Sequence, residues 1–126
     1  MPKASKSTAS RSQDHGVMEG HYGDVGEYTV GFETFREDAD GTPLFRGLPD
    51  DRCQSPHWGV VLSGKLTFRY ADHEETFVAG DAYYAGPGHL PLVFEGTEVV
   101  EFSPTVEMNQ TMAVIERNMA AAGADA

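Results

Sequence analysis

Residues 57–103 read HWGVVLSGKLTFRYADHEETFVAGDAYYAGPGHLPLVFEGTEVVEFS, and this stretch decides the fold. Short apolar segments recur in it about every 8 to 12 residues, and turns built on Gly, Asp or Pro separate them. Residues 65–70 show the most regular alternation. Leu66, Phe68 and Tyr70 are predicted to face the interior, and the polar residues between them to face water. This spacing is typical of an antiparallel sandwich or barrel, so we predict an all-β fold.

The segments on either side have a different character. Residues 1–20 are rich in Ser, Lys and Ala without apolar periodicity, which predicts a disordered N-terminal tail. The barrel is therefore expected to span residues 21–104, with a bulge or bend near Glu33 where the alternation of apolar residues breaks. After Pro104, apolar residues recur at helical spacing, which predicts an amphipathic helix over 105–121. The residues of this stripe are Met108, Met112, Ile115 and Met119. The helix would pack on the barrel or form a dimer contact.

Charge and cysteine content exclude several classes of protein. The chain has 126 residues with 9 Lys and Arg against 20 Asp and Glu, a net charge of −11. So acidic a chain repels phosphate backbones and anionic lipid, so we expect neither a nucleic-acid nor a membrane partner. No apolar run is long enough to cross a membrane, and the N-terminal residues lack a secretory signal. The single cysteine, Cys53, excludes a disulfide framework, and we expect a cytoplasmic protein.

Two histidines and the cysteine are candidates for chemistry. His57 begins an apolar strand, where an imidazole needs partners, and His89 lies in a Gly/Pro loop that could rim a barrel mouth. Cys53 precedes His57 by four residues, and Pro56 between them predicts a turn rather than a continuous strand. The turn would let Cys53 and His57 face the same interior. Asp51 lies two residues before Cys53, on the same side of an extended chain, and could join them.

The segment from about Gly47 to Pro104 resembles a small single-domain cupin, similar to bacterial cupins of unassigned function. The first cupin motif, G-x5-H-x-H-x3,4-E-x6-G, anchors its last glycine on Gly64 and places its three ligand positions at residues 51, 53 and 57. The second motif anchors on Gly80 and the Pro87–Gly88 loop, and its histidine position falls on Pro91, two residues after His89. The resemblance implies a cupin-type double-stranded β-barrel, or jelly roll, with a C-terminal α-helix.

At these positions the chain carries Asp51, Cys53 and His57 in place of the usual two histidines and glutamate. Cys53, His57 and His89, with Asp51, are therefore the candidate ligands of a divergent metal site. A thiolate with two imidazoles favours zinc over iron, nickel or manganese, and three protein ligands leave a coordination position open. The site would suit a metal-dependent hydrolase, lyase or isomerase acting on a small molecule. The alternatives are a metal-free barrel that binds or senses a small molecule and a structural remnant without a ligand.

Aromatic residues on the predicted strands point to the same interior. Five of them are candidates to line a pocket or to fill the barrel: Phe68, Tyr70, Tyr83, Phe94 and Phe102. Trp58, next to His57, would face the opposite side, against another sheet or a dimer partner. Together with the cupin resemblance, this predicts a homodimer.

Overall fold

The computed structural model describes residues 3–124, which form two β-sheets and one long helix. The elements, in chain order, are β1 (Arg11–Asp14), β2 (Met18–Val25), β3 (Tyr28–Phe35), β4 (Ala39–Asp40), the 3-10 helices η1 (Thr42–Phe45) and η2 (Pro49–Asp51), β5 (His57–Ser63), β6 (Lys65–Arg69), β7 (Glu74–Val78), β8 (Ala82–Ala85), β9 (Leu90–Val93), β10 (Thr97–Pro104) and α1 (Thr105–Ala124). The predicted all-β fold with a C-terminal helix is confirmed.

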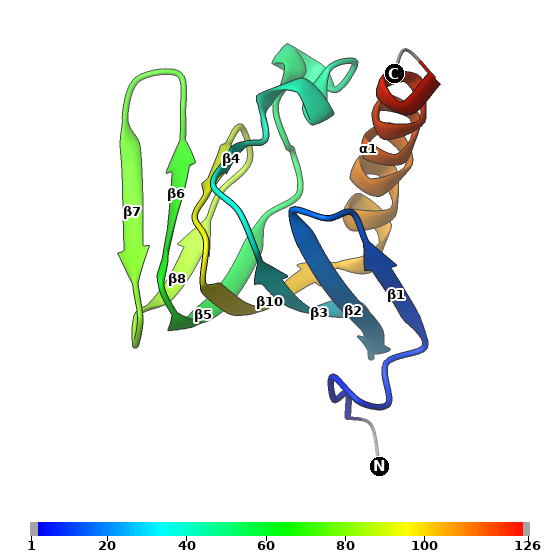
Figure 1. Cartoon of the computed structure of the whole chain (residues 1–126), viewed down its shortest axis with the longest axis vertical. Coiled ribbons are helices and arrows are strands. Elements are labelled where there is room, and N and C mark those ends of the chain that lie inside the picture. The colour runs from blue at the N-terminus through cyan, green and yellow to red at the C-terminus, as the bar shows by residue number, and fades with distance from the viewer. Residues whose placement is uncertain (1–2, 125–126) are drawn as a thin grey trace.

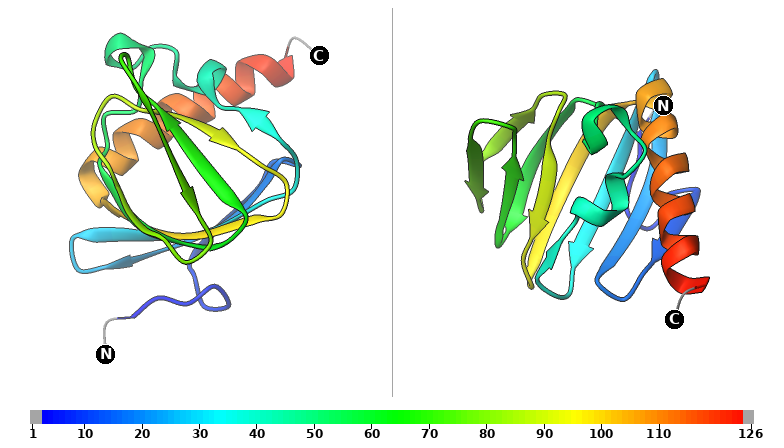
Figure 2. Two further views of the ribbon diagram at one scale, coloured as in Figure 1. Left: turned by 90° about the vertical axis from the view of Figure 1, so that its left-hand side faces the viewer. Right: turned by 90° about the horizontal axis from the view of Figure 1, so that it is seen from above.

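The two sheets are antiparallel and share a core. One has the strand order β1-β2-β3-β10-β5-β8 and the other β4-β9-β6-β7, so strands far apart in sequence are neighbours (Figure 1). Figure 2 shows the strands wrapped into a barrel, with α1 running along one side of it. The core between the sheets contains Val61, Leu66, Phe68 and Val99, all at most 3% exposed. Burial of this kind supplies the main driving force for folding.

The C-terminal helix packs on the barrel. It begins at Thr105, where the amide donates to the carbonyl of Glu27 at 3.0 Å, and most of its contacts are with η1, β10 and β3. Asn118 donates to the carbonyl oxygens of Leu44 and Arg46 at 2.7 and 2.9 Å, which fixes the helix against η1. Within the chain the helix therefore packs against η1 and the barrel, and a dimer contact through it stays a prediction.

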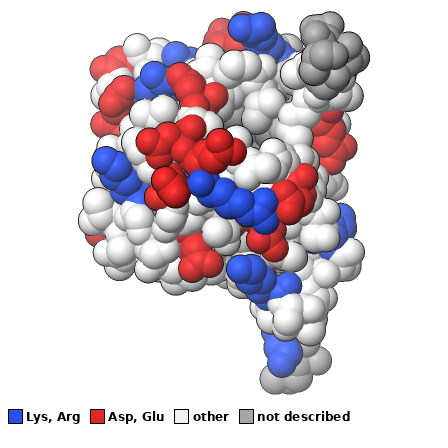
Figure 3. All heavy atoms as spheres, in the orientation of Figure 1, with Lys and Arg blue, Asp and Glu red and all other residues white. Residues whose placement is uncertain are grey.

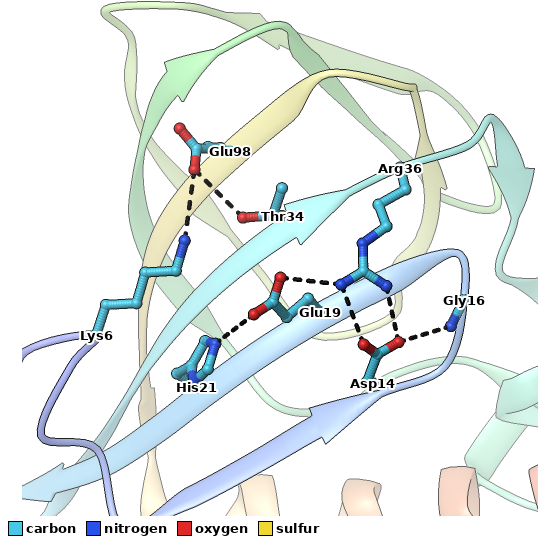
Figure 4. Close-up of polar contacts among 8 residues, drawn as sticks. All are labelled: Lys6, Asp14, Gly16, Glu19, His21, Thr34, Arg36 and Glu98. Atoms are coloured by element: carbon cyan, nitrogen blue, oxygen red, sulfur yellow. Dashed lines mark hydrogen bonds and ion pairs between the residues drawn. The ribbon is translucent and has the colours of Figure 1, made fainter.

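The N-terminal segment differs from its prediction, because residues 11–20 are not a disordered tail. Arg11–Asp14 pairs with β2 in regular antiparallel register, and β2 begins at Met18. Arg36 donates to both carboxylate oxygens of Asp14, at 2.7 and 3.1 Å, and to Glu19 at 3.0 Å (Figure 4). The hydrogen bond from Arg36 lowers the pKa of Asp14 to about 2. The polar composition of β1 hid this strand, since its partners lie elsewhere in the chain.

Two predictions about single strands were also wrong. No bulge occurs near Glu33, because β3 pairs without interruption with β2 and with β10. Within residues 3–124, a register shift occurs between β10 and β5, at Glu98/Val99. Thr67, expected to meet water, is 4% exposed, and its hydroxyl bonds that of Thr76 at 2.8 Å. A threonine can be buried when a neighbouring strand offers a hydroxyl partner.

Charged side chains are scattered over the face seen in Figure 3. Figure 3 shows acidic side chains over much of one face, with basic ones between them. Within residues 3–124, no helix has both the length and the apolar character of a membrane span.

Candidate metal centre and ligand cavity

Cys53, His57 and His89 come together at one end of the barrel, as the sequence predicted. Cys53 follows η2 and forms an isolated antiparallel bridge with His89, in which the Cys53 amide donates to the His89 carbonyl at 3.0 Å. Beyond Pro56 the chain enters β5, whose first residue is His57. One ligand atom from each side chain lies within 4.8 Å of the other two.

Hydrogen bonds orient both imidazoles toward the thiol. His89 Nδ1 lies 2.6 Å from the carbonyl oxygen of Gly86. A carbonyl can only accept, so Nδ1 carries the proton and Nε2 keeps its lone pair. His57 Nδ1 lies 2.6 Å from Ser103 Oγ, and its Nε2 lies 3.7 Å from Cys53 Sγ. Metal-binding histidines are commonly held in this way, with the second nitrogen fixed by a hydrogen bond.

Burial sets the protonation of the three side chains. Cys53 and His89 are each 1% exposed and His57 is 6% exposed. Burial lowers the pKa of His57 to about 4 and, with the nearby His57, that of His89 to about 3. Burial also raises the pKa of the Cys53 thiol to about 12. The imidazoles are therefore neutral, the form that binds a metal, whereas the thiol would lose its proton only to a bound cation.

The donor set fits a zinc ion. With Zn–S and Zn–N bonds of about 2.3 and 2.0–2.1 Å, a tetrahedral site separates sulfur and nitrogen by about 3.6 Å. The separation of 3.7 Å between Cys53 Sγ and His57 Nε2 is close to that value. These three residues would hold the ion and leave a fourth position for water or substrate.

Asp51, the fourth predicted ligand, lies outside this group. Its side chain is exposed, and its Oδ1 accepts a hydrogen bond from the Gly47 amide at 2.9 Å. The backbone of Asp51 has a φ of 55°, in the left-handed region. This turn, which parity along an extended strand cannot anticipate, directs Asp51 away from Cys53.

A cavity of about 600 Å³ adjoins the three residues and extends between the barrel and α1. Its apolar walls include Phe35, Phe68 and Val93 from the sheets and Met108, Met112 and Ile115 from α1. The helical stripe of the sequence is therefore the wall of a cavity. Cavities of this size and composition are typical of small-molecule sites.

Of the five predicted pocket aromatics, only Phe68 lines this cavity. Tyr83 is buried in the core against Phe68, and the Tyr70 hydroxyl accepts from the Gly86 amide at 3.0 Å. Phe94 lies under Lys65 Nζ, 4.4 Å from its ring centroid, and Phe102 is 42% exposed on the outer face of its sheet. Phe102 follows the buried Glu101, so the alternation of the strand turns it outward.

Solved structures resemble this chain closely enough to identify its fold. A protein of unknown function from Rhizobium leguminosarum bv. viciae 3841 matches with a TM-score of 0.59 and 18% identity, over 82% of this chain and 95% of that one. An RmlC-like cupin from Shewanella frigidimarina NCIMB 400 matches with a TM-score of 0.54 and 16% identity, over 80% and 88% of the two chains. KdgF from Halomonas sp. matches with a TM-score of 0.52 and 16% identity, over 75% and 86%. The chain has a cupin fold.

No protein-family model matches the sequence, and no curated protein matches it either. At identities below 20%, likeness to solved structures concerns the fold alone. What this protein does must therefore be argued from its own residues.

Two glutamates that no sequence pattern singled out also line the cavity: the half-buried Glu33 on β3 and the buried Glu101 on β10. Tyr22 donates to Glu33 at 2.6 Å and Tyr83 donates to Glu101 at 2.7 Å. Burial, together with the repulsion of Glu101, raises the pKa of Glu33 to about 7, and burial raises that of Glu101 to about 7 as well. The alternation around Val99 and Ser103 was the signal that Glu101 faces inward.

Glycines make room for the two tyrosines that bond these glutamates. Five residues that pair across neighbouring strands form one cross-strand row over β2, β3, β10, β5 and β8. In this order they are Tyr22, Gly31, Glu101, Gly59 and Tyr83. A Cβ at Gly31 would lie 2.9 Å from Tyr22 Cε1, and one at Gly59 would lie 2.5 Å from Tyr83 Cζ. Each ring therefore occupies the space over a glycine, and each hydroxyl donates to a carboxyl group that lines the cavity.

Proposed function

We propose that this cupin is a metal-dependent enzyme that acts on a small molecule held in the cavity. The observation that supports it is the convergence of three buried ligand atoms within 4.8 Å beside a cavity of about 600 Å³. Zinc is the ion that the thiol and two neutral imidazoles favour, before iron, nickel or manganese. The reaction would be a hydrolysis, an elimination or an isomerisation of a polar group on that molecule.

Each residue has a defined task in this proposal. When bound, the metal would polarise an oxygen of the substrate or lower the pKa of a bound water. Ser103 and the Gly86 carbonyl hold the two imidazoles in their orientation. Phe68 and the apolar side chains of α1 exclude bulk water around the reacting group.

Elemental analysis of protein purified without a metal-affinity tag tests the proposal. We expect close to one equivalent of zinc per chain, and its loss in Cys53→Ala and His57→Ala. Cobalt provides a second readout, because a thiolate from Cys53 gives a charge-transfer band that Cys53→Ala removes. Wild-type protein that takes up neither zinc nor cobalt would contradict the proposal.

A metal-free binding module is the second candidate, and one observation favours it. Within residues 3–124, every fully buried side-chain nitrogen or oxygen already has a hydrogen-bond partner, and Cys53 Sγ lies 3.7 Å from the carbonyl of Ser55. The fully enclosed polar atoms of the site are therefore satisfied without an ion. In this case small organic ligands would raise the melting temperature of metal-free protein, since a ligand of the native state stabilises it.

A further inference from the structure

The charged side chains of the described cavity wall are all acidic. Among the described lining residues, the charged side chains are Glu33, Asp40 and Glu101, with no Lys or Arg. Asp40 already accepts hydrogen bonds from Arg69 and Thr42, which with the Thr42 amide lower its pKa to about 2. Glu33 and Glu101 have no Lys or Arg partner in the part of the chain that the structure describes. An anionic ligand would be desolvated beside two carboxyl groups without a counter-charge, so this wall selects against one.

The carboxyl groups of Glu33 and Glu101 each keep one oxygen free of hydrogen bonds. Tyr22 occupies Glu33 Oε2 and Tyr83 occupies Glu101 Oε1, and within residues 3–124 the other oxygen of each accepts no hydrogen bond. Glu101 is only 9% exposed, and its Oε2 lies 3.8 Å from His57 Nδ1, which is already bonded to Ser103. Over the same residues, no fully enclosed oxygen lacks a partner, so both free oxygens are open to the cavity. Two acceptors therefore face the space where a ligand would lie.

The sheet holds these acceptors in place. Glu101 stands between Gly31 and Gly59 in its cross-strand row, and Glu33 stands between Gly20 and Val99 in another. The tyrosine rings fill the space over the glycines, which fixes one oxygen of each carboxyl group. Such a site is preorganised, because little side-chain freedom remains to be lost when a donor binds.

From this we infer that the cavity binds an organic cation, with a primary ammonium group between Glu33 and Glu101 and an apolar part against Met108, Met112 and Ile115. An ammonium group offers three donors, and its charge relieves the repulsion between the carboxylates. A hard metal ion would need six or more oxygen ligands, whereas two carboxylate oxygens are free here. The inference rests on the proposed function in one respect, that this cation would be the substrate of the enzyme. Binding of the cation by the two carboxyl groups does not require zinc.

Isothermal titration calorimetry with three probes of one chain length tests this inference: hexylammonium, hexan-1-ol and hexanoate. On metal-free wild-type protein we expect hexylammonium to bind at least ten-fold more tightly than hexan-1-ol, and hexanoate to bind more weakly than either. Glu33→Gln and Glu101→Gln should each reduce hexylammonium affinity ten-fold or more. Glu107→Gln, which removes an exposed carboxylate of α1, should leave it unchanged.

The outcomes separate the two proposals. Equal binding of hexylammonium and hexan-1-ol, or tighter binding of hexanoate, would overturn the inference without use of any variant. Hexylammonium binding to protein that takes up no zinc would support it while the proposed metal centre fails. Zinc uptake without discrimination among the three probes would overturn it while the metal centre stands.

Discussion

Ser103 is the residue through which the barrel positions His57. Its hydroxyl lies 2.6 Å from His57 Nδ1, on the side of the ring away from Cys53. Both side chains are buried, so water cannot easily replace the hydroxyl. The fit of His57 to a metal therefore depends on a residue that would not itself contact the ion.

Ser103→Ala should weaken zinc binding by about 10- to 100-fold, the usual effect of losing a group that orients a metal-binding histidine. Competition with a chromophoric chelator measures the affinity. Ser63→Ala is the matched control, because Ser63 donates to Gly96 at 3.0 Å, away from the three ligands. Equal zinc affinity in Ser103→Ala and wild type would contradict this role for Ser103.

Glu33 makes stability depend on pH. Burial and the charge of Glu101 on β10 raise its folded-state pKa from 4.5 to about 7, and the hydrogen bond from Tyr22 on β2 opposes the rise. Glu101 itself lies 3.8 Å from His57 Nδ1 on β5. A raised pKa means that the folded chain binds the proton more tightly. The stability that protonated Glu33 contributes to the fold is therefore fully present below pH 4.5. It is lost as the pH rises through 7.

Across this window, wild type should lose stability relative to Glu33→Gln by at most about 1.4 kcal/mol per pH unit. Urea unfolding at several pH values measures the difference. The buried histidines also titrate here, in both proteins, so their effect cancels in the comparison. Parallel stability curves for the two proteins would show that Glu33 has an ordinary pKa.

At the scale of elements, the absence of a side chain at Gly59 on β5 leaves the space that the Tyr83 ring of β8 occupies. A Cβ there would lie 2.5 Å from Tyr83 Cζ and 2.8 Å from the Val100 carbonyl oxygen. Gly59→Ala should destabilise the protein by about 1–3 kcal/mol through overpacking, as measured by urea unfolding. Gly86→Ala is the control, since its Cβ would meet nothing closer than 3.5 Å. A Gly59→Ala protein as stable as wild type would refute the tight packing.

Alternation and turn residues predicted the central strands because each has one apolar face. The strand Arg11–Asp14 was missed because it is polar and depends on β2 and Arg36 for its order. Pro56 predicted that Cys53 and His57 meet, since local turn chemistry encodes that approach. Glu33 and Glu101 were missed because a glutamate in a strand normally faces water. Only the tyrosines of other strands explain why these two face the cavity.

At the scale of the whole molecule, the part of the outer face of the six-stranded sheet around Trp58 is aromatic. Phe102, Trp58 and Tyr84 lie in one cross-strand row, and each is 41–50% exposed. Tyr28 packs edge-on against Trp58, with ring centroids 5.9 Å apart. Monomers rarely expose a continuous aromatic surface of this kind, so we propose that two copies of the chain pair through this face.

Trp58→Ser should shift the protein from dimer to monomer, because aromatic residues at the centre of an interface carry much of its binding energy. Light scattering coupled to size exclusion would give twice the chain mass of 13.7 kDa for wild type and the chain mass for Trp58→Ser. Val106→Ser is the control, since Val106 is 69% exposed on α1, outside this sheet. Trp58 faces away from the cavity, so zinc content should not change, and loss of the dimer would thus be separable from loss of the metal centre. A monomeric wild type, or a Trp58→Ser protein that remains a dimer, would rule out pairing through this face.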